Sequence, residues 1–352
     1  MTSAPLDAPR AVGARTTDET ASFVGGLAGS LALAWLLYNA LLGWSGKLGF
    51  VCFWYAVFLA LYAGLSALSN PLAVVKDRMA SAVVQGAAAV VGLALASTAY
   101  FIVRNGLSAV LHLNFFTQDM AGVRPTAPLT QGGIRHALIG TAIEVGLATA
   151  ISLPLGIGTA VYLTEARGRV VNRVRTVIEA MTALPDILAG LFVYAFLIIA
   201  LHWERTGFTA SLALSVTMIP IVARSSEVVL RLVPSGLREA SLALGASRWQ
   251  TVRRVVLPTA RSGLATALIL GIARVAGETA PLLIVSGAST FTNTDPFHDP
   301  MNSLPLFIFS AIRSGQTLFI ERGYGAALVL LVFVSVMFGT ARFLARDKVR
   351  AR

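Results

Sequence analysis

Long runs of apolar residues with few or no charged side chains constrain this chain more than any other feature of its sequence. A helix needs about 20 such residues to cross the hydrocarbon core of a bilayer. Eight windows of roughly this length qualify, namely residues 22–42, 50–68, 82–103, 137–163, 180–202, 208–223, 262–286 and 323–341. The chain is therefore predicted to be all-α, a polytopic integral membrane protein with about eight transmembrane helices.

The composition excludes most other classes of protein. Charged residues make up 13% and hydrophobic residues 56% of the 352 residues, whereas about 25% of a typical soluble domain is charged. A soluble globule with so few charges could not keep this much apolar surface away from water. Disordered tails, disulfide scaffolds and most cytosolic enzymes are therefore excluded.

The basic residues predict the orientation of the helices. The chain carries 28 Lys and Arg against 17 Asp and Glu. If the N-terminus lies inside and the eight windows alternate, 20 of the basic residues fall on cytoplasmic segments and seven on external ones. Cytoplasmic loops of membrane proteins are enriched in this way. We therefore expect both termini in the cytoplasm, and we assign the positive charge to loops at the lipid bilayer and not to nucleic-acid binding.

Enzymatic chemistry has no support in the sequence. The phosphate-binding pattern G-x4-G-K-[ST] is absent, so the chain is not expected to hydrolyse ATP. The single Cys52 cannot form an intramolecular disulfide. The four histidines are scattered and make no metal-ligand pattern; they are His112, His136, His202 and His298. We expect no catalytic residue, no metal site and no cofactor bound by this chain.

The segment 224–261 is too structured to be a simple tether between spans. Ser235 is predicted to cap the start of a short helix, and Gly245 to end it in a left-handed turn. A second helix is predicted to begin at Trp249 and to close at Leu257 and Pro258. Such an element suits docking into a groove of a soluble partner. An amphipathic loop that rests on lipid headgroups is the alternative.

This segment resembles the EAA loop of binding-protein-dependent ABC importer permeases. The family pattern is E-A-A-x3-G-x9-I-x-L-P, and this chain departs from it at Ser241 and Val255. The resemblance implies that the loop is a coupling helix seated in a cleft of an ATPase subunit, where Glu239 holds the contact and Gly245 permits the turn. The matching residues are Glu239, Ala240, Ser241, Gly245, Val255, Leu257 and Pro258.

A narrower resemblance, to the PstA family of phosphate-importer permeases, covers residues 82–346. It is carried by the run from Gly271 to Leu283, by Phe115-Phe116-Thr117 and by Leu184-Pro185-Asp186-Ile187. The resemblance implies a phosphate-importer permease in a bacterial cell membrane, made of a six-helix core. It also implies partners: a second, PstC-like permease subunit, two PstB-like ATPase subunits that use ATP and magnesium, and an extracytoplasmic PstS-like phosphate-binding protein.

Two other transport functions stay open. Permeases of related oxyanions such as molybdate and sulfate share the coupling loop. A secondary transporter also places charges inside the membrane, but it has no need of a projecting loop with this spacing.

The resemblance divides the chain into four parts. Residues 1–21 are a cytoplasmic tail, and 22–81 are an additional transmembrane hairpin with its linker. Residues 82–346 are the permease domain, with the importer core at about 136–342 and the coupling loop at 224–261. Residues 347–352 are a second cytoplasmic tail.

Arg274 and Glu278 are the strongest candidates for a site inside the membrane. An Arg at a helix centre costs about 2.5–3.5 kcal/mol on insertion scales, so it needs a partner or a wet cavity. The i,i+4 spacing puts Glu278 on the same helical face, close enough to pair. A guanidinium binds a phosphate oxyanion through two parallel hydrogen bonds. The residues alone leave two alternatives open, part of an anion path or an ion pair that only fixes helix packing. Because the resemblance implies phosphate as the cargo, Arg274, Glu278 and Thr279 are assigned to the phosphate path.

Two acids remain to be placed. The PstA family tends to have a small polar residue where Asp186 stands. Because a carboxylate would repel phosphate, Asp186 is expected either to face away from the path or to be paired. Glu144 is expected near an external vestibule, beside an arginine of a partner subunit, or at a helix end where it reaches water.

Overall fold

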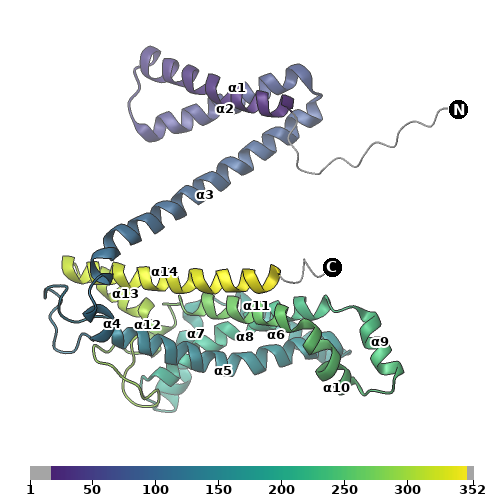
Figure 1. Ribbon diagram of the computed structural model, residues 1–352, viewed down its shortest axis with the longest axis vertical. Coiled ribbons are helices and arrows are strands. Elements are labelled where there is room, and N and C mark those ends of the chain that lie inside the picture. The colour runs from purple at the N-terminus through teal and green to yellow at the C-terminus, as the bar shows by residue number, and fades with distance from the viewer. Residues whose placement is uncertain (1–16, 347–352) are drawn as a thin grey trace. The chain divides into compact units, whose positions relative to one another are not determined.

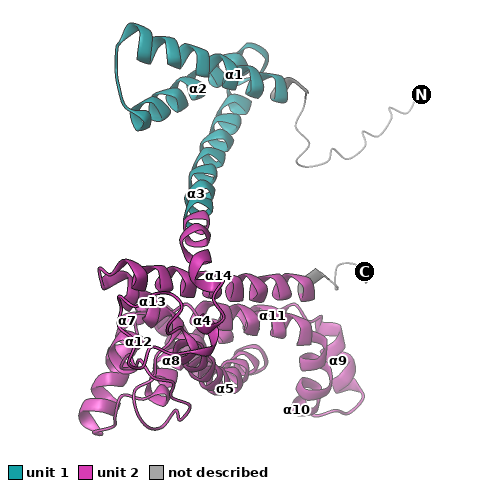
Figure 2. Ribbon diagram, turned by 60° about the vertical axis from the view of Figure 1, so that its left-hand side comes forward, with its two compact units in different colours: residues 1–98 teal, residues 99–352 magenta. Residues whose placement is uncertain are grey.

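The computed structural model describes the backbone of residues 17–346 and the side chains of residues 20–344. Most of the predicted tail 1–21, and all of the tail 347–352, lie outside these ranges. Helices and loops make up the described chain, which has no strand. The prediction of an all-α membrane protein is confirmed: seven helices are long and apolar enough to cross a membrane, or eight if one bent pair is a single span. The chain forms two compact units, residues 1–98 and 99–352 (Figure 2).

Unit 1 is a helical hairpin followed by the first part of a long helix. Its elements are α1 (Thr17–Trp35), the π-helical turn η1 (Leu36–Leu41), α2 (Lys47–Ser69) and the start of α3 (Leu72–Val110). Phe23 of α1 contacts Phe58 and Tyr62 of α2 edge-on, with the ring centroids 5.5 and 5.8 Å apart. At the hairpin turn, the Tyr38 ring contacts Trp44 and Phe50 edge-on at 5.6 and 5.7 Å. Such ring pairs add specific geometry to the burial of apolar area, and here they hold α1 against α2.

Helix α3 begins earlier than the apolar window 82–103. Only Asn70 and Pro71 separate it from α2, because proline is favoured at the start of a helix and cannot continue the one before it. Residues 72–81, predicted as part of a linker, are therefore helical. The domain boundary after residue 81 stays a prediction, since α3 runs through it without a break.

Unit 2 is a bundle built around α8. The elements after α3 are α4 (Asn114–Thr117), α5 (Arg135–Glu165), α6 (Arg169–Ala183), α7 (Asp186–Val193), η2 (Tyr194–Ala200), α8 (Gly207–Arg231), α9 (Ser235–Ala243), α10 (Arg248–Thr251), η3 (Val252–Val256), α11 (Leu257–Val275), α12 (Leu282–Val285), α13 (Leu304–Arg313) and α14 (Thr317–Arg346). Leu214, Met218 and Val222 of α8 are buried in the main core, between α5, α7, α11 and α12. Figure 1 shows α5, α8 and α11 side by side, with α9 and α10 at one end of the unit and α4, α12 and α13 at the other.

The window 180–202 does not form one straight helix. Helix α6 ends at Ala183, and the pair α7–η2 leaves it at an angle of 104°. Proline lacks an N–H and pushes the residue before it out of the α region. Leu184 accordingly has φ −69° and ψ 131°, and α7 begins just after Pro185.

The window 262–286 is also broken, so its prediction as one helix is wrong. Helix α11 ends at Val275, and a turn leads to Pro281 and the short helix α12. A helix that continued would place the ring of Pro281 against the carbonyl of Gly277. Glu278 and Thr279 therefore lie in a turn and not on a helix.

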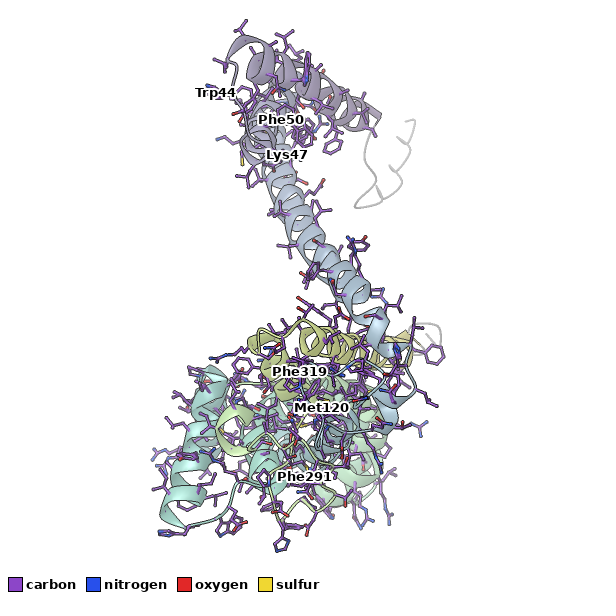
Figure 3. All side chains as sticks on the ribbon, turned by 90° about the vertical axis from the view of Figure 1, so that its left-hand side faces the viewer. Trp44, Lys47, Phe50, Met120, Phe291 and Phe319 are labelled. Atoms are coloured by element: carbon purple, nitrogen blue, oxygen red, sulfur yellow. The ribbon has the colours of Figure 1, made fainter. Side chains whose placement is uncertain are left out.

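The loops predicted to be external gather at one end of unit 2, which faces the viewer in Figure 3. Phe115, Ile134 and Phe307 are buried together there. Met120 N–H donates to the Thr290 carbonyl at 3.0 Å and so joins the two long loops. The apolar stretch 304–312 forms α13, which lies against α14 and α5.

Arg322 holds one of these loops in place. Helix α14 starts at Thr317, six residues before the apolar window, so it includes this arginine. Its side chain is buried, and Nη2 donates to the carbonyls of Ala127, Pro128 and Gln131 at 2.8–3.0 Å. The sequence placed Arg322 among external charges; the structure shows that it is a buried link between α14 and the loop.

Replacing Arg322 by Met keeps the apolar stem and removes these hydrogen bonds. Each charge-assisted bond contributes roughly 1.5–3 kcal/mol, so Arg322→Met is expected to free the segment 120–133. Hydrogen–deuterium exchange should speed up there by at least about tenfold, while α5 and α8 stay protected. Arg313→Met is the matched control, because Arg313 lies only over the Phe309 ring at 5.1 Å. Equal exchange in the two variants would contradict the link.

Candidate translocation and coupling sites

A cavity of about 400 Å³ lies at the bend between α6 and α7. Helices α8 and α11 complete its wall. The lining residues are Met181, Thr182, Leu184, Asp186, Ala189, Val216, Thr217, Pro220, Ile221 and Arg274. The break before α7 thus opens a space among the helices and brings one cation and one carboxylate to its surface.

Arg274 is shared between two carboxylates. Its Nη2 atom lies 3.6 Å from Asp186 Oδ2 and 3.7 Å from Glu278 Oε1. Both distances exceed the 2.7–2.9 Å of a charge-assisted hydrogen bond, so attraction between charges holds the group loosely. More than half of the Arg274 side chain is exposed, at 56%. Of the two alternatives for Asp186, the structure shows pairing.

The structure brings together two of the three residues assigned to the phosphate path. Arg274 pairs with Glu278 across the turn that follows α11, where Gly277 N–H donates to the Arg274 carbonyl at 3.2 Å. Neither Glu278 nor Thr279 is among the residues that line the cavity, so Arg274 alone of the three reaches its surface. Helix α11 ends at Val275, so helical spacing does not carry Thr279 to the face of Arg274.

Glu144 lies neither at a helix end in contact with water nor at a surface that could meet an arginine of a partner subunit, since its exposure is 0%. Ser286 Oγ lies 2.8 Å from Glu144 Oε1 and 2.5 Å from the Met301 carbonyl oxygen. Glu144 is therefore part of an internal polar contact between α5 and the long loop after α12.

Asp119 joins the two predicted external loops at their surface. Its carboxylate accepts hydrogen bonds from Thr292 N–H and Thr292 Oγ1, both at 2.9 Å, and from Ala121 N–H at 3.1 Å. Burial raises the pKa of Asp119, but these hydrogen bonds outweigh it and hold the pKa below its ordinary value. The loops therefore present one connected surface.

The opposite end of unit 2 carries the segment that we call the coupling element, α9 to α10. Gly245 has φ +83° between the two helices, as the left-handed turn predicted. Pro234, and not Ser235, occupies the N-cap position of α9, and Ser235 makes no capping bond. Leu244 and Trp249 are exposed, at 89% and 66%. The element is thus a projecting helix–turn–helix with an apolar surface.

Leu257 and Pro258 do not close the second helix. The sequence predicted an end there, but α10, η3 and α11 form one continuous helix from Arg248 to Val275. The π-helical turn Val252–Val256 ends one residue before Leu257 and Pro258 open the first turn of α11, so only Leu257 separates it from the proline. The wider π-helical turn leaves room for a proline ring that the regular i→i−4 hydrogen bonds of an α-helix would exclude. The coupling element is therefore joined by one helix to Arg274.

The residues of the EAA pattern divide into an internal contact and a free surface. Ser241, which departs from the family's alanine, lies 2.9 Å from Thr251 Oγ1 through its hydroxyl oxygen and so joins α9 to α10. Glu239 and Ala240 are exposed, and Glu239 makes no hydrogen bond or ion pair with the rest of the described chain. Its carboxylate is available to a partner.

A cluster around Glu227 was missed at the level of sequence. Glu227 is 3% exposed and accepts hydrogen bonds from Arg175 at 2.8 Å and Arg231 at 2.7 Å, while Arg224 lies at 3.6 Å. The i,i+3 and i,i+4 spacing of Arg224, Glu227 and Arg231 was a local signal. These arginines were counted only as cytoplasmic charge, yet the cluster joins α6 to α8. Over the described part of the chain, no group of three His, Cys, Asp or Glu could hold a metal ion.

Comparison with known proteins agrees with this geometry. Residues 152–350 match the family described as "Binding-protein-dependent transport system inner membrane component". Phosphate transport system permease protein PstA 1 of Mycobacterium tuberculosis is 40% identical over 239 residues, which are 68% of this chain and 78% of that protein. PstA of Mycobacterium leprae is 40% identical over 248 residues, and PstA of Haemophilus influenzae 33% over 252 residues. They cover 69% and 71% of this chain, and 81% and 86% of those proteins.

Among solved structures, the inward-facing MetNI methionine ABC transporter aligns with a TM-score of 0.47 and 22% identity, over 61% of this chain and 95% of that chain. The sequence relationships rest on much higher identity and carry the assignment by themselves. The chain belongs to the family of binding-protein-dependent transport system inner membrane components, the multi-pass permeases of ABC transporters, and within it to the PstA permeases.

Proposed function

We propose that this chain is the transmembrane permease subunit of an ATP-driven importer of inorganic phosphate. The relatives at 33–40% identity are phosphate permeases. The observation that carries the proposal is Arg274, an arginine shared between Asp186 and Glu278 at the surface of the cavity.

The loose pairing suits a site that binds an anion and releases it. A phosphate that enters the cavity competes with both carboxylates for the guanidinium. Two of the four phosphate oxygens can accept the parallel N–H hydrogen bonds of the guanidinium. The carboxylates at 3.6 and 3.7 Å limit the affinity, because they replace the anion as it leaves. The exposure of the Arg274 side chain favours this role over a packing pair, which would be buried.

The partners follow from the same proposal. Two PstB-like ATPase subunits bind the coupling element and a matching element on a PstC-like second permease subunit, and they hydrolyse ATP with magnesium. A PstS-like binding protein delivers phosphate to the joined loops at the other end of the bundle. Both termini of this chain lie in the cytoplasm, and the chain itself binds no cofactor. Nucleotide shifts the balance between two packed arrangements of the helices.

Phosphate uptake by the complete importer in proteoliposomes tests the proposal. Arg274→Ala removes the fork and is expected to lower kcat/KM for phosphate by about 10- to 100-fold, while the subunits still purify together. Sulfate and molybdate are measured in parallel. Uptake of either in preference to phosphate would replace the proposed substrate, and loss of assembly in Arg274→Ala would favour the packing role.

Asp186→Asn removes one competitor for Arg274 and keeps the shape of the side chain. Because exposed ion pairs contribute about 0.2–1 kcal/mol, the apparent KM for phosphate is expected to fall by about 1.4- to fivefold. Initial rates over a range of phosphate concentrations measure it. An unchanged or higher KM would show that Asp186 does not compete with the anion.

Gly245 offers a graded test of the coupling element. Its φ of +83° costs a non-glycine residue about 1–2 kcal/mol, and asparagine tolerates this region better than other residues. A Cβ atom added at this position meets nothing within 4 Å. Gly245→Val is therefore expected to weaken co-purification of the ATPase and to abolish uptake, while Gly245→Asn retains both in part. Equal behaviour of the two variants would exclude backbone conformation as the cause.

A further inference from the structure

The coupling element is attached to the bundle by one side chain that the EAA pattern does not include. Arg238, in α9, donates from Nε to Glu165 Oε1 at 3.0 Å. Its Nη1 donates to the Val233 carbonyl and its Nη2 to the Leu230 carbonyl, both at 2.9 Å. Only 22% of the side chain is exposed. One guanidinium thus contacts three parts of the chain.

These three acceptors lie at the ends of two core helices. Glu165 is the last residue of α5, and the Leu230 and Val233 carbonyls lie at the end of α8. The last carbonyls of a helix have no partner within the helix and carry a partial negative charge. A planar cation with donors in fixed directions satisfies them and binds the carboxylate at the same time. Arg238 therefore caps α8 and joins it to α5 and α9.

The backbone link between α8 and α9 is short and consists of Leu232, Val233 and Pro234. The rest of its surface is exposed, including Leu237 and Leu242. The second connection of the element is different in kind, since α10 continues as one helix to Val275. The bond between Ser241 and Thr251 joins the two sides.

Both connections lead to the cavity. The α10–η3–α11 helix carries Arg274, and α8 contributes Val216, Thr217, Pro220 and Ile221 to the wall. Helix α11 packs directly on α8, and Arg238 adds a contact that passes a displacement of α9 straight to the ends of α8 and α5. With that contact, both walls of the cavity move with the coupling element.

We propose that Arg238 is the positioning residue that transmits movement of the coupling element to α5 and α8, and so keeps phosphate transport coupled to ATP hydrolysis. The inference rests on the proposed importer function. In this inference Arg238 controls how much phosphate is carried for each ATP hydrolysed. It does not bind the ATPase, because Glu239 and the exposed apolar residues provide that contact.

The test is this ratio in proteoliposomes that contain the complete importer. Arg238→Met keeps the apolar stem and removes all three hydrogen bonds. It is expected to leave ATP hydrolysis within about twofold of the unmodified importer and to lower phosphate carried per ATP by about fivefold or more. Arg238→Lys, which cannot reach all three acceptors, is expected to be intermediate. Arg173→Met is the matched control, because Arg173 lies outside the coupling loop, is exposed and has no hydrogen bond or ion pair in the described chain.

Glu165→Ala provides a second, milder variant if Arg238→Met does not assemble. It removes only the link to α5 and is expected to lower the ratio by about twofold. The double variant should be no worse than Arg238→Met alone, because Arg238→Met already removes the bond to Glu165. The inference would be overturned by a normal ratio in Arg238→Met, or by additive losses in the double variant. If Arg238→Met does not assemble, a normal ratio in Glu165→Ala would overturn it. An unmodified importer that carries no phosphate would overturn the proposed function itself, which separates the two failures.

Discussion

A charged side chain buried in an apolar bundle needs a partner of opposite charge or a hydrogen-bond acceptor, and this requirement organises the structure. Charged residues are 13% of the chain, and a charge taken out of water without a partner costs several kcal/mol. The chain meets this requirement at the joints between elements. Glu227 joins α6 to α8, Arg322 joins α14 to the loop before α5, and Arg238 joins α9 to α5 and α8. Few charges are present, and those with close partners hold segments together that are distant in the sequence.

Arg274 stands apart from these joints by its geometry. The bonds of Glu227 to its two closest arginines are 2.7 and 2.8 Å long, whereas Arg274 lies 3.6 and 3.7 Å from its carboxylates. A group that serves only to hold helices gains from short, buried hydrogen bonds. A group that must exchange its partners for a passing anion needs weaker contacts and access to the cavity. The distances therefore separate structural arginines from the candidate transport arginine, although the sequence presents them all as the same residue type.

Hydropathy predicted which segments are helices better than it predicted where they end. The windows mark apolar stretches, but backbone hydrogen bonds continue past them, so α3, α8 and α14 are all longer than their windows. The helices are interrupted at Pro185 and Pro281. The helix is not interrupted at Pro258, where a π-helical turn accommodates the proline. Gly245 was predictable because a left-handed turn favours glycine. The pairing of Arg274 with Asp186 was left open, since residues 88 positions apart give no local signal of contact.

The coupling element has two connections to the helices that line the distant cavity. One continuous helix of 28 residues, Arg248–Val275, links it to Arg274, and at 1.5 Å per residue this helix is about 42 Å long. The other connection is the short segment between α8 and α9, which the hydrogen bonds of Arg238 reinforce. Helices α8 and α11 also pack on each other, so the two connections meet along the bundle. In the function proposed above, movement of the coupling element reaches both helices and shifts them against α6 and α7, which supply the rest of the cavity lining.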